Sequence, residues 1–267
     1  MEEIVIIKAK DKNGNLIEFN PKGGRYRYKV NGEPKKGVTS LIGERSGKGA
    51  LMWWSEHIVY QALSNKFKAM GKPIDFSQQF TDDLKAKVKT LKEEASSIGT
   101  NLHKLAECYV TKQDFALPET EPLKTMFFKF KAYWDKSGFK AMDTEKTMYS
   151  TDLDVCGTCD MIVTKPSWKG KYGILDIKTS KDFYFDMPIQ LHTYKKLCED
   201  STDYKIDYLA VLNVPKEPAK DVSLMSYKIT PKYLKAFKAC KYINAIEEDF
   251  KKRMNEYNKL RSKKYAK

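Results

Sequence analysis

The sequence predicts an α/β protein built around one mixed sheet, and three observations lead to this prediction. Segments with a helical pattern alternate with segments of strand-like pattern, which is typical of the α/β class. No Pro/Gly/Ser-rich stretch is long enough to link independent domains, and no internal repeat is visible. The length of 267 residues suits one large domain. We therefore expect a single domain over residues 1–267.

The first region, residues 1–45, is predicted to form short strands and turns. Ile4–Ile7 is strand-like and is followed by the turn Asn13–Asn15. Tyr26–Val30 alternates with a period of two and leads into Asn31-Gly32, a dipeptide typical of tight hairpins. We expect an N-terminal β-hairpin region here.

The second region, residues 46–136, is predicted to be helical. A helical pattern runs from Ala50 to about Ile98, with an interruption near Gly71–Pro73. Two further helices are expected at about 99–112 and 121–136, because proline residues separate them.

The third region, residues 137–230, is predicted to hold the central sheet. Its strands and its one helix are expected at the following positions: strands Lys146–Ser150, Gly157–Val163, Tyr172–Lys178, Tyr208–Val214 and Ser223–Ile229, and helix Met187–Cys198. The last region, 231–267, is predicted to be a long helix that begins at Pro231, a favourable first-turn residue, and becomes strongly basic after Phe250.

Charge and composition indicate the partners and the compartment. Lys and Arg number 49 against 35 Asp and Glu, so the formal net charge is +14 and a polyphosphate such as nucleic acid is the first candidate partner. No apolar run approaches the roughly 20 residues that span a bilayer, and the first residues lack the pattern of a secretory signal. Five irregularly spaced cysteines favour reduced thiols, so we expect a cytoplasmic protein with no membrane partner.

The residues that indicate chemistry lie between positions 99 and 194. His103 and Glu107 are four residues apart in a predicted helix and therefore share one face. Asp160 lies in a predicted strand, and the next strand carries Asp176 and Lys178 two residues apart, on the same face. An unpaired carboxylate within an apolar strand costs free energy, so a function is favoured for both acids.

Hairpin geometry brings the two acids together. If the turn between the strands is centred on Trp168, then Asp160 faces Asp176 and Ile162 faces Ile174. Two adjacent carboxylates repel each other unless a cation lies between them or one is protonated. An oxygen-rich cluster suits Mg²⁺ or Mn²⁺, and a nearby imidazole favours Mn²⁺. Lys178 would position a water molecule or help to deprotonate it, or would neutralise charge on a phosphorus centre.

The order of these residues resembles the PD-(D/E)XK nuclease superfamily. The matching elements are Gly99–Glu107 (GTxxHxxxE), Gly157–Asp160 (GTxD), the strand segment Leu175–Thr179 (LDIKT) and Gln190–Tyr194 on the following helix. Within the superfamily, the RecB-like branch is most similar, and there the phage-type and mitochondrial genome maintenance exonucleases. The resemblance covers about residues 25–230 and implies a restriction-endonuclease-like core with a mixed sheet, an N-terminal hairpin and a helical insertion.

The resemblance also implies a role for each matching residue. The implied metal ligands are His103, Asp160, Asp176 and the backbone carbonyl of Ile177, and the implied catalytic residues are Lys178, Asp160 and Asp176. Glu107 would be a further metal ligand or would hold a water molecule near the metal. Gln190 and Tyr194 would orient the lysine or the substrate strand. Several RecB-like relatives hold an Fe–S cluster, but the C-terminal region here offers only Cys240, so no cluster is expected.

The implied function is a metal-dependent DNA exonuclease that acts on DNA ends, with single strands as the expected substrate, in phage or bacterial DNA recombination, repair or degradation. Two alternatives stay open: a nuclease subunit of a helicase, recombination or CRISPR-adaptation-type assembly, and a non-catalytic DNA-binding protein that retains the fold. A helicase or recombination protein is therefore a possible partner besides DNA.

Three other motifs are better explained without a function of their own. Gly43–Gly49 resembles a phosphate-binding loop but is one residue short of it. Cys156 and Cys159 form a lone CxxC pair with no second pair to complete a zinc site. Trp53 and Trp54 could stack on bases, although aromatic residues at helical spacing more often belong to a core.

Overall fold

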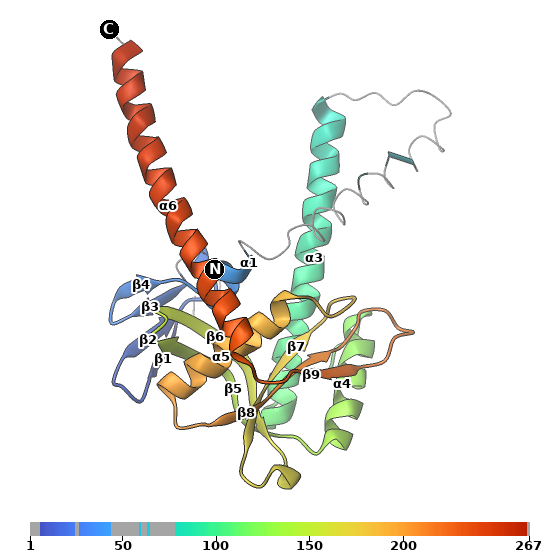
Figure 1. Cartoon of the computed structure of the whole chain (residues 1–267). Helices are drawn as coiled ribbons and strands as arrows, with labels where there is room; N and C mark the ends of the chain where they lie inside the picture. Colours follow the sequence, from blue (N-terminus) through green and yellow to red (C-terminus); the bar gives the residue numbers. More distant parts are fainter. Residues whose placement is uncertain (1–5, 25–26, 44–58, 60–62, 65–77, 266–267) are drawn as a thin grey trace.

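The computed structural model of the chain describes residues 6–24, 27–43, 59, 63, 64 and 78–265 (Figure 1). Several sequence predictions lie outside the described residues: most of the strand at 4–7, most of the helical pattern between 50 and 77, the glycine-rich segment after Gly43, and the pair Trp53 and Trp54. The described residues form an α/β fold in which helices cover a mixed sheet (Figure 1).

The central sheet has five strands, which follow one another across the sheet in chain order. The strands are β5 (Lys140–Ser150), β6 (Val155–Thr164), β7 (Tyr172–Lys178), β8 (Ile206–Asn213) and β9 (Ser223–Ser226). All neighbours pair antiparallel except β7 and β8, which are parallel. A parallel pair needs a crossover, and helix α5 (Asp186–Ser201) provides it. The α/β class with one mixed sheet is thus confirmed.

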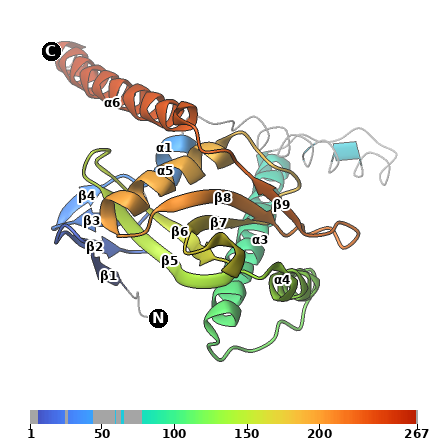
Figure 2. The ribbon, with the colours of Figure 1, turned by 60° about the horizontal axis from the view of Figure 1, so that its bottom comes forward.

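Helices cover both faces of this sheet (Figure 2). The remaining helices are α1 (Val38–Gly43), α3 (Gln78–Thr111), α4 (Leu123–Ser137) and α6 (Pro231–Tyr265). Strand residues Ile162 and Ile174 pack in one apolar cluster with α1, α5 and α6. Their neighbours Met161 and Leu175 pack in a second cluster with α3 and α4. This division follows from the alternation of side chains along a strand that is buried on both faces.

The N-terminal region is a four-stranded antiparallel sheet rather than a single hairpin. Its strands are β1 (Ile7–Lys10), β2 (Leu16–Phe19), β3 (Tyr28–Val30) and β4 (Glu33–Lys35), in that order. The hairpin predicted at Asn31-Gly32 is confirmed as the β3–β4 turn, since Val30 pairs with Glu33. Strand β1 begins at Ile7, where the strand predicted at 4–7 was expected to end, and β2 was not predicted because its four residues are too few to show a clear alternation.

Three predicted boundaries are wrong. Helix α3 is continuous from Gln78 to Thr111, although a helix start was expected at Gly99. A glycine inside a helix costs only about 1 kcal/mol, and packing of the helix on the sheet outweighs that cost. A Cβ at Gly99 would lie 3.3 Å from Oγ1 of Thr179, so the glycine allows α3 to approach the end of β7 closely. Strand β5 begins at Lys140 instead of Lys146, and β9 ends at Ser226 instead of Ile229.

All five cysteines are free. Cys156 and Cys159 belong to different apolar clusters, so their side chains are not placed to share a metal.

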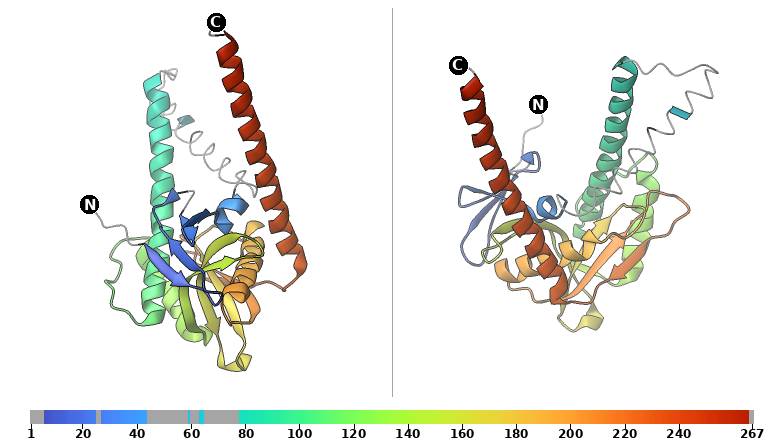
Figure 3. Two further views of the ribbon diagram at one scale, coloured as in Figure 1. Left: turned by 90° about the vertical axis from the view of Figure 1, so that its left-hand side faces the viewer. Right: turned by 45° about the horizontal axis from the view of Figure 1, so that its top comes forward.

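Among the described helices, none has the length and hydrophobicity needed to cross a bilayer. The N-terminal part of α3 and the C-terminal part of α6 both extend away from the sheet (Figure 3).

Candidate metal centre

Three acidic side chains lie in register on three neighbouring strands. In the β5–β6 pair, Thr144 is opposite Met161 and Lys146 is opposite Cys159, so Glu145 lies opposite Asp160. Glu145 has a positive φ of 44°, a conformation that costs free energy for a residue with a side chain. Strain of this kind persists where the surrounding structure imposes it, and here it occurs beside the acid at the centre of the row.

The second half of the row follows from the β6–β7 hairpin. Ile162 pairs with Ile174 and Met161 pairs with Leu175, which confirms the register predicted from the turn. One step further along, Asp160 is opposite Asp176. The backbone hydrogen bonds between β6 and β7 end before this pair is reached. Asp160 therefore has Glu145 on one side and Asp176 on the other, at a point where the sheet is not regularly paired.

A backbone donor fixes the central acid. The N–H of Ile177 donates a hydrogen bond of 2.6 Å to Oδ2 of Asp160. The side chain of Asp160 therefore takes the place of the backbone acceptor that regular pairing would provide. This contact leaves the second carboxylate oxygen, Oδ1, to face helix α3.

Helix α3 supplies an imidazole to the same point. Nδ1 of His103 lies 3.3 Å from Oδ1 of Asp160, and the two side chains are 28% and 14% exposed. One ligand atom each from His103, Glu145 and Asp160 lie within 4.8 Å of one another. One nitrogen and two carboxylate oxygens at this spacing can converge on a single cation.

Asp176 and Lys178 form a buried ion pair beside this group. Nζ of Lys178 lies 2.7 Å from Oδ2 of Asp176, whose side chain is only 3% exposed. Apart from that contact, Oδ2 of Asp176 has no hydrogen-bond partner among the described residues. The ammonium group of Lys178 therefore offsets the cost of burying this oxygen.

Burial and charge shift the pKa values of the imidazole and the central acid in opposite directions. Burial alone lowers the pKa of His103, but the charge of Asp160 and its contact with the ring outweigh this effect and raise the pKa to about 9. Burial alone raises the pKa of Asp160, but His103 and then Lys178 outweigh it, so the pKa is lowered. Without a metal, His103 and Asp160 are therefore an ion pair at neutral pH.

The outer acids have raised pKa values. Burial, followed by the charge of Asp160, raises the pKa of Glu145 to about 7. Burial also raises the pKa of Asp176 to about 6, with Lys178 opposing the shift and Asp160 adding to it. In both residues, burial and neighbouring negative charge disfavour the ionised carboxylate. A divalent cation between the acids would stabilise the ionised forms.

Glu107 lies next to the row but outside the close group. Its Oε1 accepts a hydrogen bond of 3.1 Å from the hydroxyl of Thr144, the residue before Glu145 on β5. The structure thus places Glu107 on the predicted side of α3 and brings Glu145, rather than Glu107, into the group with His103 and Asp160.

The two predicted residues of α5 contact each other. Nε2 of Gln190 donates a hydrogen bond of 2.8 Å to Oη of Tyr194, which is buried. A Cβ at Gly157 would lie 2.8 Å from Cε1 of Tyr194, so the glycine of the GTxD segment makes room for this ring. The charge of Asp176 is among the causes that, after burial, raise the pKa of Tyr194, which indicates that the ring lies near the acids.

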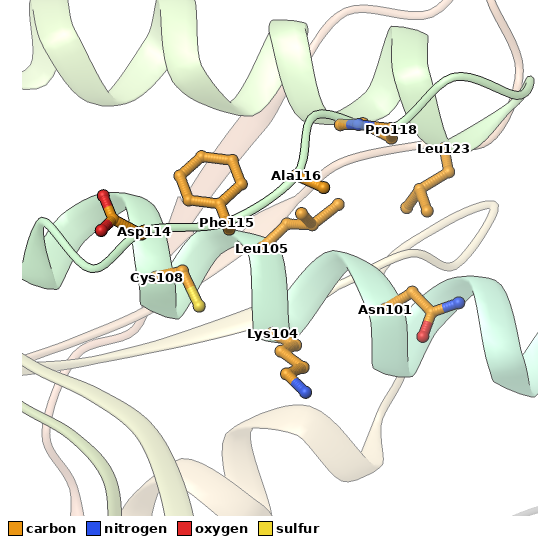
Figure 4. Close-up of a pocket in the computed structure, with 9 residues that line it drawn as sticks. All are labelled: Asn101, Lys104, Leu105, Cys108, Asp114, Phe115, Ala116, Pro118 and Leu123. Atoms are coloured by element: carbon orange, nitrogen blue, oxygen red, sulfur yellow. The ribbon is translucent and has the colours of Figure 1, made fainter.

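An apolar cavity on the other side of α3 is not part of this centre. It has a volume of about 380 Å³ and lies between α3, the segment 114–118 and the start of α4 (Figure 4). Asn101, Lys104 and Cys108 line it from α3. At 100° per residue these positions are on the opposite side of the helix from His103. The cavity and the acids are thus separated by the helix itself.

Of the predicted ligands, the structure brings His103 and Asp160 into contact and places Asp176 beside them. Sequence reasoning missed Glu145, because residues 140–145 carry charges that weaken the strand signal. No sequence signal marks Glu145: its place follows only from the observed β5–β6 register, in which Thr147 pairs with Thr158 and Glu145, two residues further, lies opposite Asp160. Ligation by the backbone carbonyl of Ile177 stays a prediction. Neither a scan against protein-family models nor a search of curated proteins found a match to this chain.

Proposed function

We propose that this chain is a metal-dependent deoxyribonuclease with a PD-(D/E)XK core, and that it acts as an exonuclease on DNA ends. The observation that carries the proposal is the row of Glu145, Asp160 and Asp176 across three strands, with His103 above it and Lys178 beside it. Three crowded carboxylates and a partly buried lysine in one place support a catalytic site over a binding protein without activity.

The residues fit a divalent cation. His103, Glu145 and Asp160 would hold it, and Asp176, paired with Lys178 beside them, would add a further carboxylate. Mg²⁺ and Mn²⁺ are the candidates, since oxygen ligands suit both and the imidazole favours Mn²⁺. When bound, such an ion supplies positive charge that stabilises a phosphorane-like transition state and lowers the pKa of water.

The chain's own residues would orient and neutralise the reacting groups. Lys178 keeps its proton, because Asp176 and Asp160 outweigh the effect of burial and raise its pKa. Its ammonium group would therefore stabilise negative charge on the phosphate instead of accepting a proton. Ile177 fixes Asp160 through a backbone hydrogen bond, so this carboxylate is oriented before substrate binds. Gln190 and Tyr194 would orient Lys178 or the substrate strand, and the ring of Tyr194 lies against Gly157 of β6, the strand that carries Asp160.

The net charge of +14 supports DNA as the substrate, because a basic surface attracts the phosphate backbone without regard to sequence. As a DNA-end nuclease the protein would serve recombination, repair or degradation of phage or bacterial DNA, alone or beside a helicase or recombination protein.

One experiment separates the proposed activity from its alternatives. End-labelled linear DNA, single-stranded and duplex, is incubated with the protein and Mn²⁺ beside a covalently closed circle. The proposal predicts that linear DNA is degraded from its ends while the circle stays intact. Asp160→Asn is the inactive control, and Asp143→Asn on β5 is the matched control that should cleave normally. An endonuclease would also cut the circle, and a non-catalytic protein would bind the DNA and leave both substrates intact.

A further inference from the structure

Asn213 is the last residue of strand β8 and carries a buried side-chain oxygen without a partner. The residue is 4% exposed, and its Oδ1 has no hydrogen-bond partner among the described residues. One other buried side-chain oxygen of the described residues lacks a hydrogen bond, namely Oδ2 of Asp176, which Lys178 contacts. A buried amide oxygen without a donor costs free energy, so its retention at this position requires a reason.

Asn213 lies directly beside Lys178 in the sheet. The two residues are partners in the parallel pairing of β7 with β8, and the N–H of Val214 donates a hydrogen bond of 2.7 Å to the backbone oxygen of Lys178. Side chains at paired positions point to the same face of a sheet, and neighbouring strands are about 4.8 Å apart. The flexible side chain of Lys178 can therefore reach the amide of Asn213 across the strands.

Lys178 thus has two acceptors within reach, one along its own strand and one across the sheet. Asp176 precedes it by two residues on the same face and holds its ammonium group at 2.7 Å. An ammonium group has three N–H donors and can turn from one acceptor to another. If Lys178 turned from Asp176 to Asn213, the carboxylate of Asp176 would become free for a cation.

We propose that Asn213 is a positioning residue, which accepts a hydrogen bond from Lys178 when Asp176 binds the metal. This inference rests on the proposed metal centre, to which Asp176 adds a carboxylate. Without a metal, Lys178 pairs with Asp176, and Oδ1 of Asn213 has no donor. In the metal-bound protein, Lys178 donates to Oδ1 of Asn213 and stays beside the centre.

Gln190 is the other residue expected to orient Lys178, and its side chain already has a partner. Its Nε2 donates a hydrogen bond of 2.8 Å to Oη of Tyr194. Among the described residues, the buried side-chain oxygens without a hydrogen bond belong to Asp176 and Asn213. The structure therefore favours Asn213 over Gln190 as the acceptor that Lys178 uses in the metal-bound state.

Mn²⁺ affinity and melting temperature, measured on the full chain without DNA, test the proposal. Asn213→Leu keeps the approximate shape of the side chain and removes the acceptor. In EDTA this variant should melt no lower than the wild type, because the oxygen that it loses is unpaired there. It should bind Mn²⁺ at least about tenfold more weakly, because Lys178 then keeps Asp176 as its partner and competes with the ion. Asn213→Ala removes the acceptor without adding bulk and should show the same loss of affinity.

Two further variants separate positioning from a merely structural role. Asn213→Asp keeps both the shape and the acceptor, so it should bind Mn²⁺ at least as tightly as the wild type. Asn244→Leu makes the same exchange at another buried asparagine, whose Nδ2 donates to the backbone oxygens of Leu41 and Cys240. It should lower the melting temperature equally in EDTA and in Mn²⁺, and it should leave the affinity for Mn²⁺ unchanged.

A double mutant tests whether Asn213 acts through Lys178. In the Lys178→Ala background, Asn213→Leu should not weaken Mn²⁺ binding further, because the group that needs the acceptor is absent. In the wild-type background, Asn213→Leu should lower kcat for DNA cleavage and leave KM nearly unchanged.

Equal Mn²⁺ affinity of the wild type and Asn213→Leu overturns the proposal, as does an equal loss of affinity in the Lys178→Ala background. If Gln190→Leu weakens Mn²⁺ binding and Asn213→Leu does not, Lys178 turns to Gln190 and the proposal is wrong. A wild type that binds no Mn²⁺ overturns the metal centre and this inference with it. Because Mn²⁺ binding and melting are measured without DNA, they separate this inference from the proposed exonuclease activity.

Discussion

Asp160 accepts a hydrogen bond of 2.6 Å from the backbone N–H of Ile177, at the point where β6 and β7 stop pairing through their backbones. The acid is therefore held by the sheet and not by another flexible side chain. Its second oxygen faces His103 on α3, so a single carboxylate connects the sheet to the helix. This connection makes Asp160 the residue on which the proposed metal centre would most depend.

Asp160→Asn should lower the rate of DNA cleavage at least about 10²-fold, because the variant loses a charged ligand. The fold should survive, since an amide oxygen can still accept the hydrogen bond from Ile177. The measurements are the cleavage rate in Mn²⁺ and the melting temperature of both proteins. If the variant cleaves DNA at a rate near that of the wild type, Asp160 is not a ligand of the proposed centre.

Glu145→Gln should weaken Mn²⁺ binding at least about tenfold, because the structure places Glu145 in the close group. In EDTA above pH 7 the same variant should melt at a higher temperature than the wild type. The reason is that burial and neighbouring charge raise the pKa of Glu145 to about 7, so its ionised form is unfavourable without a cation.

Titration calorimetry with Mn²⁺ and a melting curve in EDTA measure both effects. Glu107→Gln is the control, since Glu107 is held by Thr144 and lies outside the close group. If Glu107→Gln weakens Mn²⁺ binding and Glu145→Gln does not, the ligand predicted from the sequence is correct and Glu145 has another role.

Lys178→Ala should reduce kcat much more than it weakens DNA binding in Ca²⁺. The ammonium group is buried against Asp176 and is placed to neutralise charge that develops during the reaction. Single-turnover rates and binding constants, measured on the same DNA, separate these effects. A loss of affinity that explains the whole loss of rate would make Lys178 only a phosphate contact.

Mn²⁺ binding should strengthen as the pH rises from about 7 to 8.5. The pKa of His103 is about 9, so the imidazole is protonated in this range without a metal and must lose its proton to become a ligand. One displaced proton changes the apparent affinity about tenfold per pH unit. The half-saturating concentration of Mn²⁺ for cleavage, measured at several pH values, checks this slope. His103→Ala should lose both affinity and slope, and a slope unchanged in His103→Ala would show that another group binds the proton.

The sequence predicts much of the centre because hairpin register depends on few residues. The turn at Trp168 predicts that Asp160 faces Asp176; the structure has the predicted Ile162–Ile174 pair, and the same register continued by two residues places the two acids opposite each other. Glu145 could not be predicted in the same way, because its segment of β5 is charged and strained and lacks strand character. The continuity of α3 through Gly99 depends on packing against β7, which no local pattern contains.

The most direct test of the central claim is cleavage of end-labelled single-stranded DNA before and after removal of divalent cations. We expect cleavage in Mn²⁺ or Mg²⁺, complete loss in EDTA, recovery when Mn²⁺ is added back, and a rate at least about 10²-fold lower for Asp176→Asn under the same conditions. Cleavage that persists in EDTA, or that is unaffected by Asp176→Asn, would contradict a metal-dependent nuclease at this site, as would the absence of cleavage with Mn²⁺ bound.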